Sequence, residues 1–485
     1  MNRMFRMIAV VVAAITAFLL LMPEAWAVPN YSRRYNIECS GCHTMWGALN
    51  GNGVTFRLSG YRAFNGNDLT PVEKDVDLGN GAVIPSTLPL SMITGVGFDY
   101  RRETRNASNG TTNTRTASSI GLEDASIFLT TPLGEHLSAF MEFPMYETKA
   151  WEFTPTGPGE ANDTTGGRDL QFKSETPAFE VAKFFWNNLL GASAPRDSFN
   201  LLGGISHPPL AYSPGKVRLS VNQYPIYERR ALDLISPKKV DDFLSADQAD
   251  SLFRLSEPQT FVEVMGMIVP GQQVLGKKET FWMEYHLGVA NGSNGKADNN
   301  SNKDMYGRFV VRWFNQTLGA FAYYSPDTYS DDIRTAGAAG GVMSGVQSAN
   351  RMRRIGPDMT LSLAPFGIPV WLENQFMFNR ESNPTGYGKE YKWSGGFHQL
   401  NWQISKKAIV YGRYDYINGN SFNDGHNPAT KAEETDEVVG FQYLIKQTVK
   451  FAAEYRNHEF KDKESTPNIA TLKDDGFTTR FMIGF

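Results

Sequence analysis

The sequence predicts an all-β fold: a transmembrane barrel of about 16 strands, of the outer-membrane type, preceded by a small N-terminal domain. From about residue 89 onward, apolar and polar residues alternate with the period of two that marks a strand with two different faces. The segments between the predicted strands are alternately short turns and long polar loops, as in outer-membrane barrels. A soluble β-sandwich would show the same alternation of apolar and polar residues, so the alternation alone does not decide between the two folds. The alternating short and long linkers favour the barrel.

The chain begins with the features of a secretory signal peptide. Arg3 and Arg6 precede an apolar run over residues 7–22, and Ala25-Trp26-Ala27 is a small-x-small cleavage site. We therefore expect residues 1–27 to be removed. A membrane anchor is the alternative, although the run is shorter than the roughly 20 apolar residues needed to span a bilayer. No apolar run of spanning length follows, which argues against a helical membrane protein.

Residues 28–88 form the predicted N-terminal domain, and its main feature is the sequence Cys39-Ser40-Gly41-Cys42-His43. The chain has no other cysteines, and this spacing is the attachment signature of a c-type haem. Two thiols so placed can bond to the two vinyl groups of one porphyrin, and the adjacent imidazole becomes the proximal axial ligand of the iron. We therefore expect one covalent haem c, bound by Cys39 and Cys42, with His43 on the iron.

A redox disulfide and half of a zinc site are the alternative uses of the cysteine pair. A zinc site needs further Cys or His ligands nearby, but the next histidine is His136. A thioredoxin-like disulfide needs a βαβ setting, which the flanks do not suggest. Fewer than about 60 residues bury little core unaided, so the haem would be the main hydrophobic nucleus of this domain. Candidates for the walls of its pocket are Trp46, Phe56, Leu58 and Tyr61.

The second axial ligand is not identified by the sequence. Met45 lies too close to His43 along the chain to reach the opposite face of the haem. Met92 or a lumen-facing barrel residue is the remaining candidate, and His/Met ligation would raise the reduction potential.

Residues 89–485 form the predicted barrel. We expect strands near residues 90–101, 120–131, 135–146, 178–190, 197–207, 258–269, 278–290, 305–315, 317–324, 351–363, 369–379, 391–404, 408–418, 434–446, 448–459 and 477–485. An even strand number leaves both ends of the barrel on the short-turn, periplasmic side. The last strand ends at Phe485, and a terminal aromatic residue resembles the C-terminal signal of outer-membrane barrels. Interfacial girdles would include Trp313, Phe314, Tyr323, Tyr324, Trp371, Tyr414 and Tyr416.

The alternation also predicts which charges face the lumen and which loops are long. Charges expected on the inner face are Glu284, Arg308, Arg312, Arg413, Asp415, Lys450, Glu454 and Arg456. We expect residues 147–177 to form a mobile loop. We expect residues 208–257 to form a loop that carries function or constricts the lumen. A capping-box pattern at residues 245–248 predicts a short helix within the second loop. Acidic clusters expected on the outer side are Asp241-Asp242, Asp327 with Asp331-Asp332, and Glu433-Glu434; they are solvated loop charge or ligands for a divalent cation.

The mature chain resembles the fused outer-membrane monohaem cytochrome-porins that act as ferrous iron oxidases in iron-oxidising bacteria. The likeness is sharpest in residues 27–29, in the haem motif, and in Gly-Val-Thr-Phe-Arg-Leu-Ser-Gly-Tyr over residues 53–61; no proline follows soon after His43, unlike the usual pattern. The resemblance implies an Fe(II):cytochrome c oxidoreductase without a catalytic acid or base. Extracellular Fe(II) would be the electron donor, and a periplasmic c-type cytochrome or similar protein the acceptor.

Two other functions stay open. The chain would be a diffusion porin for anions or small solutes if the cysteine pair is a structural disulfide. It would be a different electron conduit if the donor is not iron or if electrons flow outward.

Because the hydrocarbon core is roughly 30 Å thick, a periplasmic haem needs to enter the barrel, or a small donor needs to come in through the lumen. The net charge of −4 argues against nucleic acid as a partner.

Overall fold

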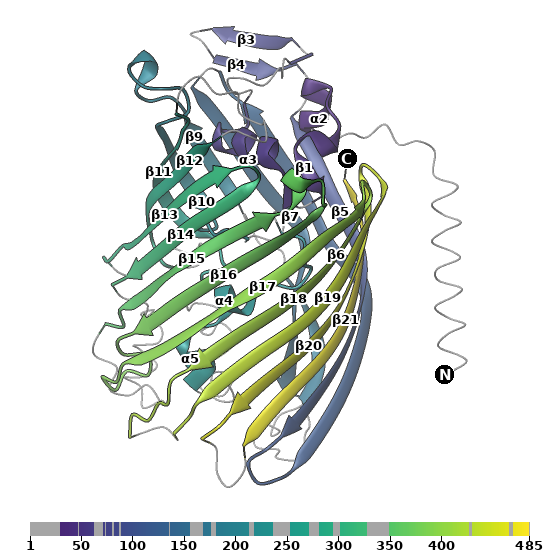
Figure 1. Ribbon diagram of the computed structural model, residues 1–485, viewed down its shortest axis with the longest axis vertical. Helices are drawn as coiled ribbons and strands as arrows, with labels where there is room; N and C mark the ends of the chain where they lie inside the picture. The colour runs from purple at the N-terminus through teal and green to yellow at the C-terminus, as the bar shows by residue number, and fades with distance from the viewer. Residues whose placement is uncertain are drawn as a thin grey trace.

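The strands of the computed structural model close into one antiparallel β-barrel (Figure 1). The structure describes residues 30–46, 48–62, 71–72, 74–79, 82–86, 89–134, 136–155, 168–175, 181–212, 218–235, 253–270, 281–293, 301–326, 349–425, 429–464 and 469–484. The predicted signal peptide, the capping box at 245–248, Phe485 and the acidic residues at 241–242 and 327–332 lie outside these ranges. None of the described helices is long and apolar enough to span a membrane.

The barrel is built from strands β5 to β21. Their bounds are β5 Leu90–Asn106, β6 Thr112–Pro132, β7 Leu137–Pro155, β8 Arg168–Glu175, β9 Val181–Trp186, β10 Asn200–Ser206, β11 Gln259–Ile268, β12 Trp282–Ala290, β13 Asp304–Trp313, β14 Gln316–Ser325, β15 Met352–Ser362, β16 Val370–Glu381, β17 Tyr391–Ser405, β18 Ala408–Gly419, β19 Ala432–Lys446, β20 Val449–Asp462 and β21 Ala470–Gly484. Sequential strands pair antiparallel, and β21 pairs with β5 to close the barrel. Strands β8 and β9 pair with opposite halves of β7 and share one position, so the 17 described strands make 16 positions, as predicted.

The prediction of a mobile loop over residues 147–177 is wrong in its described parts. Strand β7 continues to Pro155, and β8 returns alongside it in the register Glu147↔Glu175 to Pro155↔Arg168. The segment contains Trp151, Phe153 and Phe172 among its Gly, Thr and Glu residues, and aromatic residues favour strands. The hairpin therefore extends the wall of the barrel.

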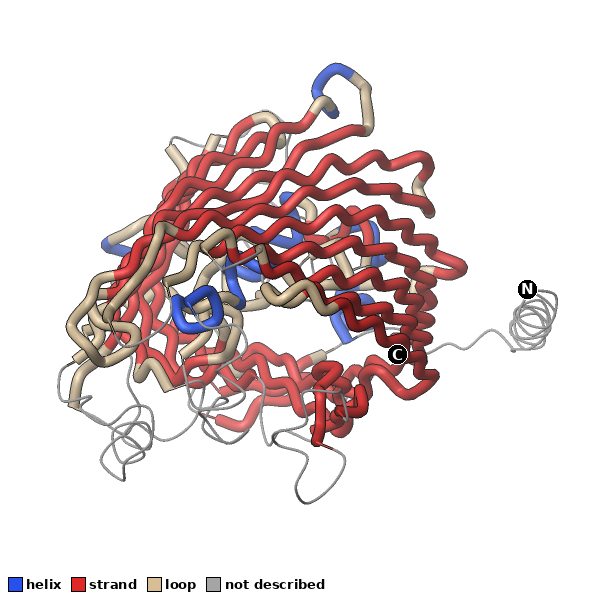
Figure 2. The backbone as a smooth tube through the Cα atoms, turned by 90° about the horizontal axis from the view of Figure 1, so that it is seen from below, coloured by secondary structure: helices blue, strands red, loops and turns tan. Residues whose placement is uncertain are grey.

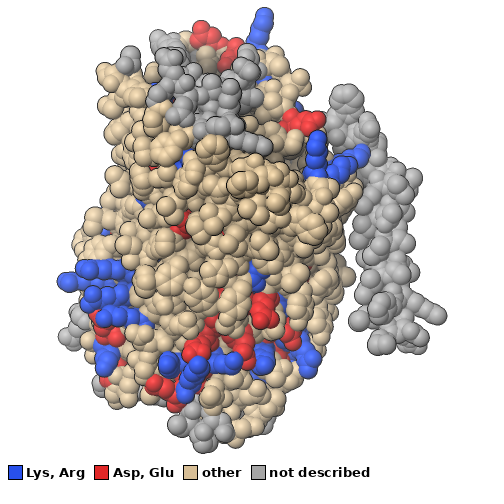
Figure 3. Space-filling model, in the orientation of Figure 1, with Lys and Arg blue, Asp and Glu red and all other residues tan. Residues whose placement is uncertain are grey.

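The outer face of the barrel is apolar and suits lipid. Large apolar side chains that are more than half exposed lie on many of the strands, among them Leu287, Ile355, Phe378, Leu400 and Val439. Figure 3 shows charged side chains gathered toward the two ends, with a broad, nearly uncharged band between them. An apolar band of this kind is how β-barrels span a membrane, so we treat the barrel as membrane-spanning.

Two residues of the predicted aromatic girdles face the lumen instead. The Tyr323 hydroxyl donates to Asp304 at 2.7 Å, and its ring stacks on Phe253 at 4.9 Å. The Trp371 indole donates to Glu373 at 2.9 Å. Each side chain carries a polar group that donates to a carboxylate inside the barrel. The two residues were assigned to the girdles because they are aromatic, although the alternation of their strands places them on the inner face. Phe314 and Tyr414 are exposed on the outer side.

The eight predicted lumenal charges do face inward. Six are buried: Glu284, Arg308, Arg413, Asp415, Lys450 and Glu454. The other two, Arg312 and Arg456, are partly buried and pair with Glu284 at 3.1 Å and Asp436 at 2.8 Å. Their burial shows that neighbouring side chains and segments inside the barrel cover the inner face at these positions.

One occupant of the lumen is the segment between β10 and β11. It contains the short helices α4 (Pro225–Glu228) and α5 (Ala231–Ile235), and Figure 2 shows helical segments inside the ring of strands. Tyr224 stacks on Phe397 of β17 with ring centroids 3.9 Å apart. Arg229 forms a two-pronged ion pair with Glu434 of β19, both bonds 2.7 Å long. The prediction that this loop folds into the lumen as a constriction is confirmed for residues 218–235.

The other occupant is the N-terminal segment. It comprises α2 (Asn30–Tyr35), the 3-10 turn η1 (Cys39–Gly41), β1 (His43–Met45), β2 (Ala48–Leu49) and α3 (Gly51–Leu58). The hairpin of β3 (Asp75–Gly79) and β4 (Ala82–Pro85) follows outside the lumen, beyond the rim of the barrel, where β3 is exposed (Figure 1). The N-terminal segment lies at the short-turn end of the barrel, where the chain also ends (Figure 1). This is the end that the sequence predicts to be periplasmic.

Aromatic packing fastens this segment to the barrel wall. The Tyr61 ring stacks on Phe140 of β7 at 4.9 Å and meets Phe185 of β9 edge-on at 5.7 Å. Phe56 packs edge-on against Tyr31 at 4.8 Å. The predicted wall residues Phe56, Leu58 and Tyr61 therefore belong to one hydrophobic core with the barrel, which supplies an apolar nucleus without any cofactor.

Candidate functional site

The haem motif forms a single tight turn that brings its two cysteines to one place. The amide of Gly41 donates to the carbonyl of Glu38 at 2.9 Å, and the amide of Cys42 donates to that of Cys39 at 3.2 Å. Both thiols are free and partly buried. Burial raises the pKa of both, that of Cys42 to about 11 with a further contribution from Cys39. Both thiols are therefore protonated at neutral pH.

The side chain of Asn50 holds the motif against helix α3. Its Oδ1 caps the helix by accepting the amide of Gly53 at 3.0 Å, and its Nδ2 donates to the carbonyl of Ser40 at 3.0 Å. Its backbone amide donates to Cys42 at 3.0 Å. Gly53 comes so close that an added Cβ would lie 2.1 Å from the Cys42 carbonyl oxygen. The Asn/Gly-rich stretch after the motif is thus the start of helix α3. The sequence signal for this start was Asn50, because asparagine is a preferred N-cap residue.

Replacement of Asn50 by alanine should loosen the motif. Loss of the cap costs about 1 kcal/mol, which corresponds to roughly fivefold faster cleavage of the segment when opening is fast relative to proteolysis. Limited proteolysis of the purified protein, followed by N-terminal mass analysis, measures this. Asn52→Ala is the matched control, because the Asn52 side chain is exposed on the same helix. Equal cleavage rates for the two variants would contradict the assigned role of Asn50.

His43 has the properties of an imidazole available to a metal. Its Nδ1 is buried and has no hydrogen-bond partner among the described residues. Burial, helped by the positive charge of Lys450, lowers the pKa of His43 to about 4. The ring is therefore neutral at pH 7, and neutral imidazole is the form that ligates iron. Together with the two free thiols, this orphaned nitrogen fits a covalently held haem.

The motif lies beside the first residues of β20 and the last residues of β21. The Lys450 ammonium donates to the carbonyl of Trp46 at 3.1 Å and lies 5.5 Å from the centroid of the Trp46 ring. A Cβ built on Gly484 of β21 would touch the same indole at 3.0 Å. Met45 is buried against Tyr411 of β18 and its neighbours. Trp46 thus remains beside the motif, whereas the other predicted wall residues pack toward β7 and β9.

The structure places Met92 away from the candidate site. Gly484 pairs with Ile93 across the closure of the barrel, and its side of the strand is the one that meets Trp46. Because successive residues of a strand point to opposite faces, Met92 belongs to the outer face of β5. The structure therefore places Met92 on the face opposite the motif, which does not favour it as the distal ligand.

A metal site of protein ligands alone is not found in the described part of the chain, where no group of three or more His, Cys, Asp or Glu residues is arranged to hold an ion. Of the acidic clusters, Glu433 pairs with Lys463, and Glu434 pairs with Arg229. These two carboxylates lie at the long-loop end, as predicted, and serve as partners for cations of the chain.

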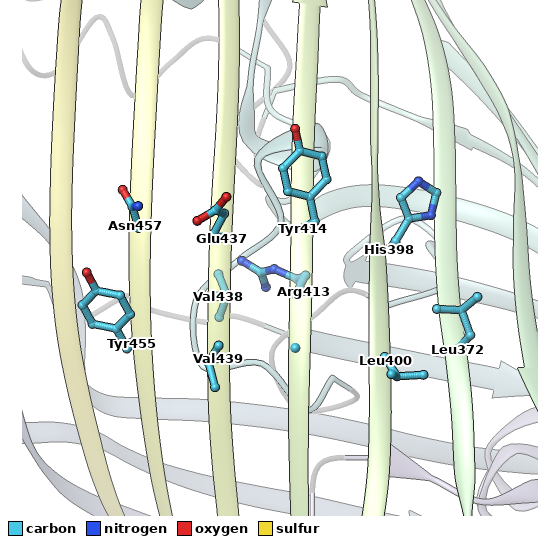
Figure 4. Close-up of a pocket in the computed structure, with 11 residues that line it drawn as sticks. Leu372, His398, Leu400, Arg413, Tyr414, Glu437, Val438, Val439, Tyr455 and Asn457 are labelled. Carbon is cyan, nitrogen blue, oxygen red and sulfur yellow. The ribbon is translucent and has the colours of Figure 1, made fainter.

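A shallow hollow of about 420 Å³ lies on the opposite side of the wall from the motif (Figure 4). Gly412 leaves its floor open, and outward side chains such as Leu400, Tyr414, Val439 and Tyr455 border it. Figure 4 shows the labelled residues spread over adjacent strands, with Tyr414 and His398 pointing the same way. Its apolar rim matches the lipid-facing band, so it is part of the outer surface.

Comparison with known proteins gives a likeness in solved structures only. No family model matches the chain, and no curated protein does. The solved structures include an anion-selective porin from Comamonas acidovorans (TM-score 0.47, 10% identity, covering 82% of this chain and 98% of that one). The outer membrane channel DcaP of Acinetobacter baumannii has a TM-score of 0.44 and 10% identity, covering 84% and 99% of the two chains. Salmonella typhi OmpF in complex with daunomycin has a TM-score of 0.39 and 12% identity, covering 84% and 100%.

Proposed function

We propose that this protein is an outer-membrane barrel that carries one covalent haem c inside its periplasmic mouth and passes electrons across the membrane. The carrying observation is the CxxCH turn within the barrel, with two free thiols and a buried, unpartnered His43 nitrogen. Cys39 and Cys42 would hold the porphyrin, and His43 would ligate the iron. When bound, such a haem accepts and releases one electron at a time.

The barrel supports the location of this site. The apolar outer band suits the lipid of the outer membrane, and the short-turn end of such barrels is periplasmic. The N-terminal segment packs inside that end through Tyr61, Trp46 and their wall partners. A haem there would be reachable by a periplasmic c-type cytochrome and would already stand within the bilayer span of roughly 30 Å.

The donor is proposed from the family resemblance. Extracellular Fe(II) needs no bond-making chemistry, so no acid or base is required of the chain. Its oxidation would occur at or near the outer surface, and the chain would act as an Fe(II):cytochrome c oxidoreductase. If purified ferric protein in detergent is reduced by Fe(II), the iron assignment gains support; if another donor reduces it and Fe(II) does not, the conduit remains and the iron assignment falls.

A diffusion porin is the second candidate, and the described barrel by itself supports it better than it supports a conduit. The lumen is lined by buried charges such as Arg308 and Glu284, and an inserted loop narrows it. Both features are found in channels for small solutes. The cysteine pair separates the candidates, since a diffusion porin has no use for haem.

A haem stain of the purified, denatured protein decides between the candidates, because only covalently attached haem survives denaturation. We expect a stained band at the mass of the mature chain and an absorption spectrum that changes between the oxidised and reduced protein. An unstained band from cells that mature c-type cytochromes would favour the porin.

A further inference from the structure

Three outward-facing cations lie side by side at the long-loop end of the wall. Arg353 of β15 pairs with Arg380 of β16, and Arg380 pairs with Lys392 of β17, so the three are direct neighbours across the strands. All three side chains are exposed. Figure 3 shows Lys and Arg side chains gathered at this end, on the side where Figure 1 draws β15 to β17. We call these three residues the cation row.

The cation row borders the lipid-facing band of the barrel. Two residues nearer the middle of the strands, Ile355 lies opposite Phe378 on the same outer face, and both are more than half exposed. Two residues along a strand cover roughly 6–7 Å. Tyr324 of β14 lies opposite Arg353, with the guanidinium 5.5 Å from the centroid of its ring, and aromatic residues of such barrels collect at the membrane interface. Because the long-loop end of such barrels is the extracellular end, the row lies at the level of the outer-leaflet headgroups.

The cation row carries more positive than negative charge. Within the described chain, Glu390 is the carboxylate that pairs with it, through one ion pair with Arg380 and another with Lys392 at 2.8 Å. Arg353 lies over the Tyr324 ring and forms no ion pair with a described residue. Like charges directly opposite each other on neighbouring strands destabilise a sheet. The row therefore presents a positive charge at the membrane surface that an anion can neutralise.

Other cations of the outer face have carboxylate partners from the chain itself. At the same end of the barrel, Lys461 of β20 and Lys473 of β21 both contact Glu459, at 2.6 and 3.2 Å. Arg353 has no equivalent of Glu459 among the described residues. The two lysines are therefore a comparison for the cation row.

We propose that the cation row binds a phosphate group of an anionic lipid in the outer leaflet. Guanidinium groups bind phosphate through two parallel hydrogen bonds, and basic residues beside a membrane attract anionic headgroups. Neighbouring strands are about 4.8 Å apart, so the row extends over roughly 10 Å, which suits the headgroup of one lipid. Ile355 and Phe378 would contact the acyl chains of the same lipid. The inference goes beyond the proposed function and applies equally to a conduit and to a porin.

The test measures lipid binding to the full-length protein, purified in detergent and freed of lipid. Native mass spectrometry gives the affinity for lipid A and for dephosphorylated lipid A, with inorganic phosphate as a competitor. Arg353→Gln/Arg380→Gln removes two charges of the row, and Arg353→Lys/Arg380→Lys keeps them. Lys461→Gln/Lys473→Gln is the matched control, because it removes two outward-facing cations at the same end of the barrel.

We expect Arg353→Gln/Arg380→Gln to bind lipid A roughly 30-fold more weakly than the wild type, at about fivefold for each cation removed from a membrane surface. The control variant should match the wild type. Glu390→Gln should bind more tightly, since it removes the carboxylate that competes with the phosphate. The lysine variant should be intermediate, because it keeps the charge but loses the paired hydrogen bonds. Dephosphorylated lipid A should bind the wild type as weakly as lipid A binds the glutamine variant.

Equal affinities of Arg353→Gln/Arg380→Gln and of the control variant for lipid A would overturn the site. Binding of dephosphorylated lipid A as tight as that of lipid A would overturn it as well. If inorganic phosphate displaces lipid A at equal concentration, the row binds phosphate from solution and the lipid assignment is wrong. The comparison of the two lipids uses the wild type alone, so the proposal can fail even if a variant does not fold.

Discussion

The double substitution of Cys39 and Cys42 by alanine should abolish covalent haem while the barrel still forms. Both cysteines lie in one short turn at the mouth, and the 16 strand positions are joined by pairing that involves neither residue. Without the thiols, no thioether bond to the porphyrin can form. Haem staining after denaturing electrophoresis should fall from full to background, and the far-ultraviolet circular dichroism of the barrel should be unchanged.

Ser40→Ala is the control for this experiment, since Ser40 lies in the same turn and its hydroxyl donates only to Glu38 on the exposed surface. We expect wild-type staining from it. Staining that survives in the double variant would mean that the haem is held elsewhere. A wild type that never stains would instead remove the conduit and leave the diffusion porin.

Replacement of Glu454 by alanine should release the inserted loop and open the lumen. Glu454 is 1% exposed and accepts hydrogen bonds from Ser220, Val221 and Asn222 of the loop, as well as from Tyr411. Removal of the carboxylate leaves several buried donors unsatisfied, and each unsatisfied donor costs about 1–3 kcal/mol. We expect a several-fold higher single-channel conductance in planar bilayers and faster proteolysis of residues 218–222.

Glu437→Ala is the matched control for Glu454→Ala. Glu437 lies on the neighbouring strand β19 but is exposed on the outer side, so its removal should leave the conductance unchanged. If Glu454→Ala conducts like the wild type, residues 218–222 do not restrict the lumen, and the path for ions lies elsewhere in the barrel.

The strand pattern was predictable because one physical rule acts along the whole wall. Lipid on one side and polar groups on the other require alternation, so Phe309 points out and Arg308 points in, as the sequence indicates. The alternation of residue types along a strand does not predict which segments lie inside the lumen. Tyr323 and Trp371 were assigned to the girdles by type, but each found a carboxylate and a packing partner within the barrel.

The candidate site was predictable only as far as contiguous residues define it. The spacing of Cys39, Cys42 and His43 predicts haem attachment, since all three lie in five consecutive residues. One of its contacts is distant in sequence: Lys450, which donates to the carbonyl of Trp46, lies some four hundred residues further along. No local signal joins such residues, because only the closure of the barrel brings β20 beside the N-terminal turn.

By itself, the sequence determined the number of strands and the inner and outer faces of the wall, and it predicted the haem motif, since each follows from a period or spacing within a few residues. Only the tertiary structure decided that the N-terminal segment packs inside the short-turn end, that the loop with Arg229 is anchored across the lumen to Glu434, and that Met92 faces outward. The physical reason is that a closed barrel brings segments that are distant in sequence into one enclosed space. There, the contacts of buried charges and aromatic rings depend on which segments are close in space.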